Sequence, residues 1–445
     1  MYDLIIAGAG TAGCLAAMTG ASLGLKVCLL DAKPLSRIGD KVCGDAVGKH
    51  HFDNLGLAYP KNEELAGELK GCKVLSPDRQ TSFTIEGLGA KAFMVNRHAF
   101  GQRLLKEAMD AGTLVLERTI ALEPIFQDGF IRGLRVLGPD GKREMHGRII
   151  VDATGFQGAI RRRLPPKLGI QVQVSQGDLQ VAYREIRFLE APLENQDYGL
   201  IFLGSRIAPG GYAWLFPKGK DIVNVGVGVQ AREGHPNPKH QLNLFLKEQE
   251  FLKASKVLDG RGGIVPTRRP LLCLVAEGLM IVGDAACQVN PIHGGGIGPS
   301  MTAGKLAAEA AAEALEKGEA SRENLWSYCL RYLRGYGAKQ AVLDVFRHFL
   351  QEAEDEELNY GMSQHIVEEE DVLKASLYGE VRLNITEKAR RFFKARGCLG
   401  FLISLRKTTR LMKRAKELYE AFPNPEGYEE WLRAENRLFE EARKL

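Results

Sequence analysis

The chain has 445 residues, of which 26% are charged and 45% hydrophobic, and a formal net charge of +5. This length is too great for one small core, so we expect two or three lobes. The net charge is small for such a chain and gives no reason to expect nucleic acid as a partner.

The first residues run directly into an apolar strand with no basic and then apolar leader, so we expect no secretory signal. The eight cysteines are scattered without a CxxC pair, which predicts neither a zinc site nor an iron–sulfur cluster. The apolar stretch 397–405 is much shorter than the roughly 20 residues that span a bilayer. We therefore expect a cytoplasmic protein that can lie on a membrane surface without crossing it.

The chain begins with an apolar strand from Tyr2 to Ala7, a glycine-rich loop, a helix to about Leu23 and a second strand, 26–30. This order is typical of the start of a doubly wound parallel sheet.

Three glycines of that loop, Gly8, Gly10 and Gly13, have GxGxxG spacing. They permit a tight turn, close approach of a pyrophosphate and close packing of helix on strand, and the helix N-terminus offers free N–H groups. Asp31 ends the second strand, where it can accept a hydrogen bond from a ribose hydroxyl. The pattern predicts dinucleotide binding but does not distinguish NAD from FAD.

Short alternating segments at about 72–93 predict a small sheet inserted into this lobe. A helix at 97–111 and strands at 129–136 and 148–152 follow. The alternation of Asp221 to Gln230 indicates an antiparallel second lobe. The predicted domains are 1–170 (nucleotide binding, first part), 171–265 (antiparallel sheet), 266–320 (nucleotide binding, second part) and 321–445 (helical).

A second nucleotide element follows the antiparallel lobe. A strand, 279–282, leads to Asp284, and the glycines of 294–298 open a new helix. FAD needs two such elements, because its ribityl and isoalloxazine parts extend beyond the pyrophosphate. The pair resembles flavoproteins of the aromatic-hydroxylase type, as does the segment 151–155 (VDATG). Arg97 can reach a phosphate or the flavin, or be a solvated helix residue.

Three further motifs narrow the resemblance: 39–46 (GDKVCGDA), 209–217 (PGGYAWLFP) and 290–296 (NPIHGGG). Together they resemble the geranylgeranyl reductase family, closely its archaeal members, over nearly the whole chain, including 268–270 and 336–340. With the glycine fingerprint, the resemblance implies that FAD contacts Gly8, Gly10, Ala12, Gly13, Asp31, Ala32, Cys43, Gly44, Ala46, Arg97, Ala121, Asp284, Gly295, Gly296 and Ile297.

The resemblance also implies an α/β fold and a reaction. The fold is a Rossmann-like FAD-binding domain interleaved with an antiparallel β-sheet substrate domain, plus a helical C-terminal region. The reaction is hydrogenation of C=C bonds in geranylgeranyl chains of archaeal-type ether lipids, by a hydride from flavin N5 and a proton. The electrons come from an external donor, NAD(P)H or a ferredoxin-like protein, which the sequence does not identify.

The aromatic residues Tyr212, Trp214 and Phe216 have strand period and share one face. They form either a sheet core or the wall of an isoprenoid channel. Flanking proline and glycine residues favour the wall, because they are poor interior-strand residues. We expect substrate contacts from His51, Pro209, Gly211, Tyr212, Trp214 and Phe216, and catalytic roles for Cys43, Tyr212, Trp214 and His293.

Cys43 follows Lys41, a cation that would favour its thiolate. Its roles are a wall against the ring, a proton relay or simple packing. His50, His51 and His293 are proton or phosphate partners or structural residues.

The C-terminal region is strongly basic, and it predicts an amphipathic helix on an anionic membrane or a solvated helix face. Its cations are Lys388, Arg390, Arg391, Lys394, Arg396, Arg406, Lys407, Arg410, Lys413, Arg414 and Lys416.

Three other functions suit the same scaffold. They are a flavin monooxygenase or halogenase, a non-redox isoprenoid cyclase and a quinone-linked electron carrier. The WxWxIP pattern of halogenases is absent, as are the cluster-binding cysteines of the quinone-linked carriers.

Overall fold

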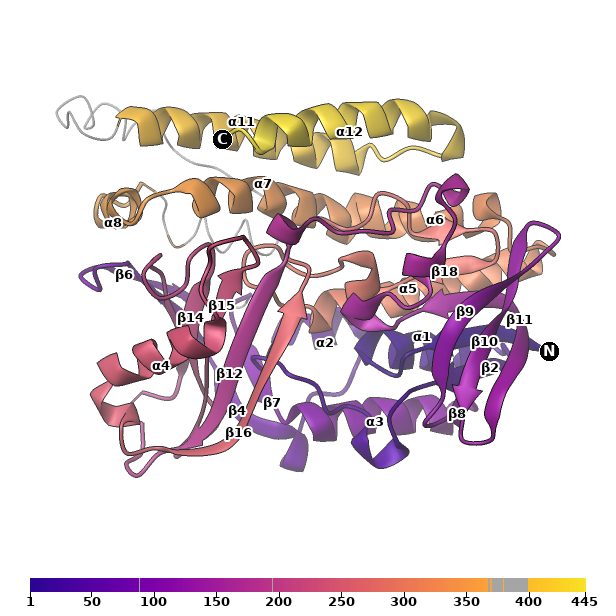
Figure 1. The fold of residues 1–445 in the computed structure, drawn as a ribbon, viewed down its shortest axis with the longest axis horizontal. Coiled ribbons are helices and arrows are strands. Elements are labelled where there is room, and N and C mark those ends of the chain that lie inside the picture. Colours follow the sequence, from indigo (N-terminus) through magenta and orange to yellow (C-terminus); the bar gives the residue numbers. More distant parts are fainter. Residues whose placement is uncertain (88, 194, 367–368, 370–378, 380–398) are drawn as a thin grey trace.

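The computed structural model describes residues 1–87, 89–193, 195–366, 369, 379 and 399–445. A mixed sheet with helices on its faces lies beside an antiparallel sheet, and a layer of helices covers both (Figure 1).

The mixed sheet has the strand order β17-β18-β11-β1-β2-β8, in which all neighbours are parallel except β17 and β18. Leu4, Ile5 and Ile6 of β1 are completely buried, as expected for a strand covered on both faces. The elements are β1 (Tyr2–Ala7), α1 (Thr11–Ser22), β2 (Val27–Leu30), α3 (Arg97–Asp110), β8 (Leu114–Leu116), β11 (Gly141–Asp152), β17 (Val275–Ala276), β18 (Leu279–Ile281) and α5 (Ile297–Glu316). The predicted doubly wound start of the chain is confirmed.

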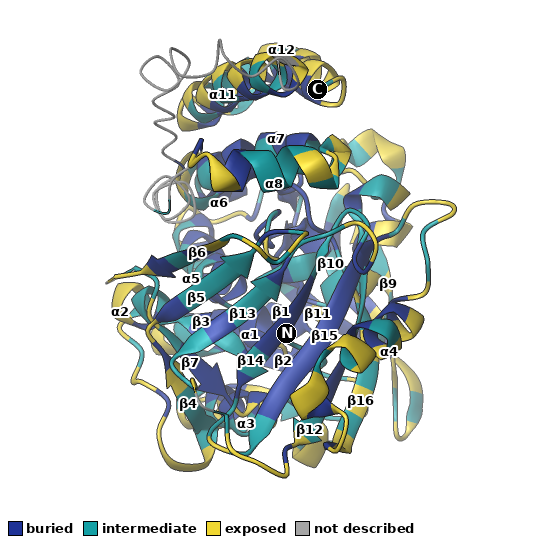
Figure 2. Cartoon of the chain, turned by 90° about the vertical axis from the view of Figure 1, so that its left-hand side faces the viewer, coloured by how far each residue is buried: buried dark blue, intermediate teal, exposed yellow. Residues whose placement is uncertain are grey.

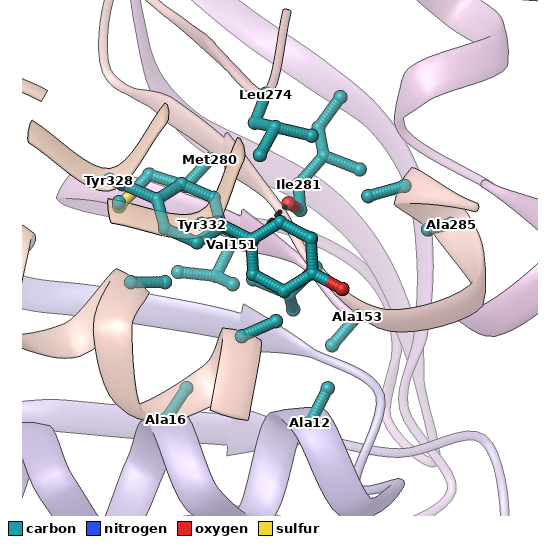
Figure 3. Packing of buried hydrophobic residues seen from close by; sticks show 14 of the residues in the cluster. Ala12, Ala16, Val151, Ala153, Leu274, Met280, Ile281, Ala285, Tyr328 and Tyr332 are labelled. Carbon is teal, nitrogen blue, oxygen red and sulfur yellow. Dashed lines mark hydrogen bonds between the residues drawn. The ribbon is translucent and has the colours of Figure 1, made fainter. Parts of the chain in front are cut away.

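Helices α1 and α5 pack closely because small residues face each other. A Cβ on Gly304 of α5 would lie 2.2 Å from the carbonyl oxygen of Ala12. Figure 3 shows Ala12 and Ala16 in the same core cluster as Tyr328, whose hydroxyl donates to the carbonyl of Ile281 (3.0 Å). On one edge β9 (Ile120–Gln127) and β10 (Phe130–Gly138) extend β11 as antiparallel strands.

The second sheet has seven strands, in the order β16-β12-β15-β14-β13-β5-β6. Helix α4 (Pro238–Glu248) covers one face, over the core that contains Ala213, Leu215 and the valines of β15. The strands are β5 (Gly71–Leu75), β6 (Ser82–Glu86), β12 (Gln180–Phe188), β13 (Tyr198–Phe202), β14 (Tyr212–Pro217), β15 (Ile222–Gln230) and β16 (Lys256–Val265).

The prediction of a separate small sheet at 72–93 is wrong. Strands β5 and β6 join the seven-stranded sheet, through a parallel pairing of β5 with β13. Strand β7 (Ala92–Val95) instead pairs with β3 (Ala46–Gly48) and β4 (Leu65–Leu69) in a three-stranded sheet, next to α2 (Lys49–Leu55). Alternation in a sequence gives the period of a strand but not its pairing partner. The predicted domain boundaries at 170, 265 and 320 stay predictions.

Helices form the third layer, visible above the sheets in Figures 1 and 2. They are α6 (Arg322–Tyr332), the π-helix η9 (Leu333–Gly337), α7 (Ala338–Glu352), α8 (Asp355–Ser363), α11 (Leu399–Glu420) and α12 (Tyr428–Ala442). Helix α11 packs along α7, with Phe401 against Phe349 (ring centroids 5.4 Å apart). In the described part of the chain, no helix is both long and apolar enough to cross a bilayer.

The apolar face of α11 is thus used inside the protein. Phe401, Leu405 and Leu411 are buried, and Ile403 is an exposed exception. The exposed cations are Arg406, Lys407, Arg410 and Lys413. Arg414 and Lys416 are half-buried, and Lys388, Arg390, Arg391, Lys394 and Arg396 lie outside the described residues.

Six buried ionic residues lie at two of the places where the chain passes between the nucleotide lobe and the antiparallel sheet, before β12 and after β16. Asp178 precedes β12, and Arg268 and Arg269 follow β16. Asp344 and Arg347 on α7 and Glu435 on α12 complete a set of three cations and three carboxylates.

Ion pairs among these six residues connect the segments before β12 and after β16 to α7 and α12. Arg347 pairs with Asp178 and with Asp344 (both 2.7 Å), and Arg269 pairs with Asp344 (3.1 Å) and Glu435. Arg268 lies 3.6 Å from Asp178. Burial would raise the pKa of Asp344, but Arg347 and the other arginines hold it well below its usual range. Charges so buried are tolerated only when each has its partners.

Replacing one member should therefore strongly destabilise the fold. We expect Asp344→Leu to lower the free energy of unfolding by about 3–5 kcal/mol, because it leaves Arg269 and Arg347 short of a counter-charge. Glu441→Gln, which breaks the exposed pair with Arg414 (2.7 Å), should cost less than about 1 kcal/mol. Urea unfolding measures both; equal effects would contradict a structural role for the cluster.

Candidate functional site

The glycine loop after β1 has the geometry that its spacing predicted. Gly8 has a φ of +105°, and a Cβ there would lie 2.4 Å from the carbonyl oxygen of Ala153. A Cβ on Gly13 would lie 1.9 Å from the carbonyl oxygen of Gly8. Gly10 is the N-cap of α1, and the space beside it is open. Two glycines are thus required by packing, while the third leaves room at the helix N-terminus for an anion.

The predicted adenosine residues lie together at the end of β2. The Asp31 carboxylate accepts from the backbone N–H groups of Ala9 and Lys33 (both 2.8 Å). The N–H of Thr119 donates to the carbonyl of Asp31 (2.8 Å), which brings Ala121 of β9 to the same region as Ala32. Asp31 therefore holds the glycine loop, and its remaining lone pairs can serve a ribose.

Arg97 provides a test of whether a dinucleotide fits. It is the first residue of α3 and only 7% exposed, so the alternative of a solvated helix residue is wrong. Its Nε and Nη1 atoms are buried and have no hydrogen-bond partner among the described residues. Its charge opposes the rise in pKa of both Cys14 and Cys43, which places it near α1 and the Cys43 loop. A buried cation without a counter-charge suits the phosphates of a bound dinucleotide.

The second nucleotide element meets the first as predicted. Asp284 lies in the 3-10 turn η8 (Gly283–Ala286), and a Cβ on Gly296 would lie 3.1 Å from its Oδ1. Gly295, Gly296 and Ile297 form the N-terminus of α5. Lys41, from the loop that carries Cys43, pairs with Asp284 (2.8 Å). Residues more than 240 positions apart therefore line one region.

The expected activation of Cys43 is wrong. The Lys41 ammonium is directed to Asp284 rather than to the thiol. Burial raises the pKa of Cys43, and the nearby carboxylate of Asp45 raises it further. The side chain is consequently a neutral thiol near pH 7, able to hold a proton rather than act as a thiolate.

The aromatic residues of β14 do not belong to the sheet's own core. They alternate with Ala213 and Leu215, which pack beneath α4, so their rings lie on the opposite face. The ring of Trp214 lies 5.9 Å from that of Tyr212 and 6.3 Å from that of Phe216. The rings therefore form a row on the face opposite α4, here called the aromatic wall, and its role in an isoprenoid channel stays a prediction.

Glycines on neighbouring strands make room for this wall. A Cβ on Gly226 would lie 2.3 Å from Trp214, and one on Gly199 would lie 2.9 Å from Phe216. Phe216 also faces the Cys43 loop, since a Cβ on Gly44 would lie 3.3 Å from its ring. The wall thus borders the loop that leads to Ala46.

Hydrogen bonds connect Tyr212 and the residues just before β14 to neighbouring segments. The hydroxyl of Tyr212 donates to the carbonyl of His293 (2.7 Å), which connects β14 to the loop before α5. Before β14, the carbonyl of Gly210 accepts from Gln180 (2.7 Å) and Gln351 (3.2 Å). Gly211 approaches the backbone of Gly228, and with Pro209 it precedes the wall. Substrate contact by Pro209 and Gly211 stays a prediction.

Three histidines gather at the N-terminus of α5. The ring of His51 packs onto Gly298, where a Cβ would lie 2.2 Å from it, and its centroid is 4.0 Å from that of His50. The Nδ1 atom of His293 accepts from the N–H of Gly295 (3.1 Å). His293 is exposed at the surface of the protein alone, and desolvation lowers the pKa of its ring to about 4.

Lys339 is the cation of this group, and nothing in the sequence around it had marked it as a site residue. Desolvation, and then the charge of Lys339, lowers the pKa of His50 to about 4. Desolvation lowers the pKa of Lys339 itself to about 8. Its ammonium lies 4.9 Å from the ring centre of Tyr336, and no carboxylate within the described ranges forms an ion pair with it. The histidines are neutral near pH 7, so the local charge is that of Lys339.

Three more residues were missed: Asp45, Lys218 and Asn224. Asp45 is 3% exposed, and its Oδ2 accepts from Lys218 (2.6 Å) and Asn224 (3.1 Å). Asn224 was the one polar residue within an apolar alternation, a signal that something pairs with it. Its partners in the Cys43 loop are about 180 positions away, so the sequence could not name them.

Comparison with known proteins agrees with this geometry. A family model for the geranylgeranyl reductase catalytic domain matches residues 178–265, and one for lycopene cyclase protein matches 3–188. A digeranylgeranylglycerophospholipid reductase of Sulfolobus acidocaldarius is 42% identical over 447 residues, covering 100% of this chain and 98% of that protein. A protein of the same description from Methanothrix thermoacetophila is 31% identical, covering 86% and 95%. The chain belongs to the digeranylgeranylglycerophospholipid reductase family.

Solved structures extend the likeness to the fold of this reductase-family chain. A geranylgeranyl bacteriochlorophyll reductase-like protein from Thermoplasma acidophilum has a TM-score of 0.78 at 24% identity, covering 93% of this chain and 99% of that one. A flavin-dependent brominase has a TM-score of 0.70 at 19% identity, covering 89% and 100%. The predicted flavoprotein fold is confirmed. The halogenase likeness is one of fold alone.

Removal of the unpaired cation should separate cofactor binding from folding. We expect Arg97→Gln to weaken FAD binding about 10- to 100-fold, because it removes charge-assisted hydrogen bonds, while the apoprotein keeps or gains stability. Arg103→Gln on the same helix breaks pairs with Glu64 (2.7 Å) and Glu107 (3.0 Å) and should leave FAD affinity unchanged. Fluorescence titration and thermal unfolding measure the two effects. Unchanged FAD affinity in Arg97→Gln would contradict the assignment of Arg97 to the phosphates of the cofactor.

Loss of Lys218 should destabilise the Cys43 loop. We expect Lys218→Met to cost about 3–5 kcal/mol of unfolding free energy, since it leaves the carboxylate of Asp45 buried without a cation. Lys70→Met removes the exposed pair with Asp197 (2.6 Å) and should leave stability nearly unchanged. If denaturant midpoints of both variants match the wild type, the buried pair has no structural importance.

Proposed function

We propose that this chain binds FAD and hydrogenates the C=C bonds of geranylgeranyl chains in archaeal-type ether lipids or their precursors. The observation that carries the proposal is the aromatic wall of Tyr212, Trp214 and Phe216, which faces the Cys43 loop instead of the sheet's own core. Membership of the reductase family supports the reaction class.

The proposed FAD site combines the glycine loop, Arg97 and the N-terminus of α5. Arg97 and the open N-terminus at Gly10 suit the phosphates, and Asp31 suits the ribose. Asp284 and the α5 N-terminus suit the ribityl and ring. Bound FAD, once reduced by an external donor, supplies the hydride that an alkene carbon accepts.

The task of the protein is to hold an unactivated alkene in place. Such an alkene is a poor hydride acceptor, so orientation and exclusion of water must contribute much of the rate. The aromatic wall offers a rigid apolar surface for an isoprenoid. Its glycine-lined backing holds the rings in fixed positions.

Two groups near the wall hold a proton at neutral pH. Burial keeps the Cys43 thiol protonated at Sγ. The Nδ1 atom of His293 accepts from Gly295, so neutral His293 carries its proton on Nε2. The Cys43 thiol can supply the proton that completes the reduction and is then left as a thiolate, whereas neutral His293 can donate a hydrogen bond from Nε2. Tyr212 orients the His293 loop through its hydroxyl.

The cationic end of the site suits an anionic head group. Lys339 carries the charge, and His50 and His51 add hydrogen-bonding capacity. Peripheral contact with an anionic membrane is proposed through the exposed cations of α11 rather than its buried apolar face.

A cyclase is the second candidate, because the lycopene cyclase model matches residues 3–188. Those residues belong mainly to the nucleotide lobe, whereas the match that covers the antiparallel sheet is to the reductase catalytic domain. The reductase is therefore favoured.

Mass spectrometry distinguishes the two candidates. A geranylgeranyl ether lipid incubated anaerobically with the protein and dithionite should gain about 2 mass units per reduced bond, and none without reductant. Unchanged lipid beside fully reduced flavin would contradict the reductase proposal for that lipid. A rearranged product of equal mass would instead establish the cyclase.

A further inference from the structure

Asn224 lies on β15, on the face of the sheet that carries the aromatic wall. It is followed on that face by Gly226, which leaves space for the Trp214 ring, and by Gly228. Of these three positions, Asn224 alone sends a side chain toward the nucleotide lobe. That side chain is completely buried, so its polar groups need partners.

The amide of Asn224 joins the aromatic wall to the Cys43 loop. The indole N–H of Trp214 donates to Oδ1 (3.0 Å), and Nδ2 donates to the carbonyl of Cys43 (2.9 Å) and to Asp45 (3.1 Å). The indole can only donate and the backbone carbonyl can only accept, which fixes the orientation of the amide. Both amide protons are therefore used.

The same loop is held at a second point. Lys218, directly after β14, donates to Asp45 (2.6 Å) and to the carbonyl of Val95 (2.9 Å). Asp45 adopts a φ of +67°, an uncommon conformation for a residue with a side chain. The conformation is thus maintained by bonds to side chains from the antiparallel sheet.

We propose that Asn224 is a positioning residue, which sets the Cys43 backbone and the Trp214 ring at a fixed separation and so aligns the alkene-binding wall with the loop that borders the cofactor. The inference rests on the proposed reductase function. Asn224 acts through Cys43 and Trp214.

Asn224→Asp is the discriminating variant. It keeps the size of the side chain and an acceptor for Trp214, but it turns a carboxylate toward Asp45 and the carbonyl of Cys43. The charged and titratable groups around that position are Asp45 and Cys43 from the loop, Lys218 after β14, Arg184 on β12 and Arg97 on α3. Two carboxylates beside one bonded ammonium favour uptake of a proton, which restores a donor between them.

The expected signature is a pH-dependent loss of turnover. With FAD-loaded protein, dithionite and the geranylgeranyl ether lipid, kcat of Asn224→Asp at pH 8 should be about 10- to 100-fold below the wild type. The ratio of variant to wild type should rise as the pH falls to 5. Asn224→Leu should stay low at every pH. Asn237→Asp, the same change at the N-cap of α4, should track the wild type throughout.

A ratio for Asn224→Asp that does not vary with pH, or a wild-type kcat in Asn224→Leu, would overturn the proposal. A second measurement needs no substrate and separates this inference from the proposed function. In FAD-loaded Asn224→Leu, iodoacetamide should alkylate Cys43 about tenfold faster than in the wild type, because the loop loses its anchor. Cys72 serves as the internal reference in peptide mass mapping. Unchanged Cys43 alkylation would also overturn the proposal, whether or not the lipid is reduced.

Discussion

The buried ion cluster at the two chain crossings is the constraint on which the arrangement of the lobes depends. The antiparallel sheet is joined to the nucleotide lobe only through the segments around Asp178 and Arg268, apart from the strands β5 and β6 that it borrows. Arg347 of α7 pairs with Asp178 in the first segment, and Asp344 of α7 pairs with Arg269 in the second. Arg347 and Asp344 also pair with each other. A buried charge without its partner is strongly destabilising, so the cluster favours the one orientation of the sheet on the lobe in which all its ion pairs form. The aromatic wall can face the nucleotide residues only in that arrangement.

Small residues then leave room for the aromatic rings and for the contact between the two lobes. Gly226 and Gly199 accommodate Trp214 and Phe216 on the sheet, and Gly44 of the Cys43 loop accommodates Phe216 across the interface. Polar contacts across the same interface, from Asn224 and Lys218 to the Cys43 loop, give the approach a unique register. Apolar contacts stabilise the interface but do not fix the alignment of the two lobes. Buried hydrogen bonds do fix it, because any other alignment would leave their polar groups without partners. A site for a flexible isoprenoid thus has a rigid frame.

Much of the nucleotide half could be predicted, because its signals are local. The glycine spacing, Asp31 and the strand before Asp284 each report the conformation of a few neighbouring residues, and the structure has them where expected. The errors arose where a side chain depends on distant partners. Lys41 was assigned to Cys43 but pairs with Asp284, and Arg97, which had a solvated alternative, is buried. The segment 72–93 showed alternation without revealing that β5 pairs with β13.

The sequence by itself determined the class of fold, the dinucleotide fingerprint, the strand period of the aromatic residues and the family resemblance, because these depend on spacing along the chain. Only the tertiary structure decided which face of β14 is the wall, that Cys43 is a neutral thiol, and that Asp45, Lys218, Asn224 and Lys339 belong to the site. These features depend on interactions between residues about 120 to 300 positions apart in the sequence. No local pattern encodes them, since each hydrogen bond forms only once the sheet has docked on the nucleotide lobe.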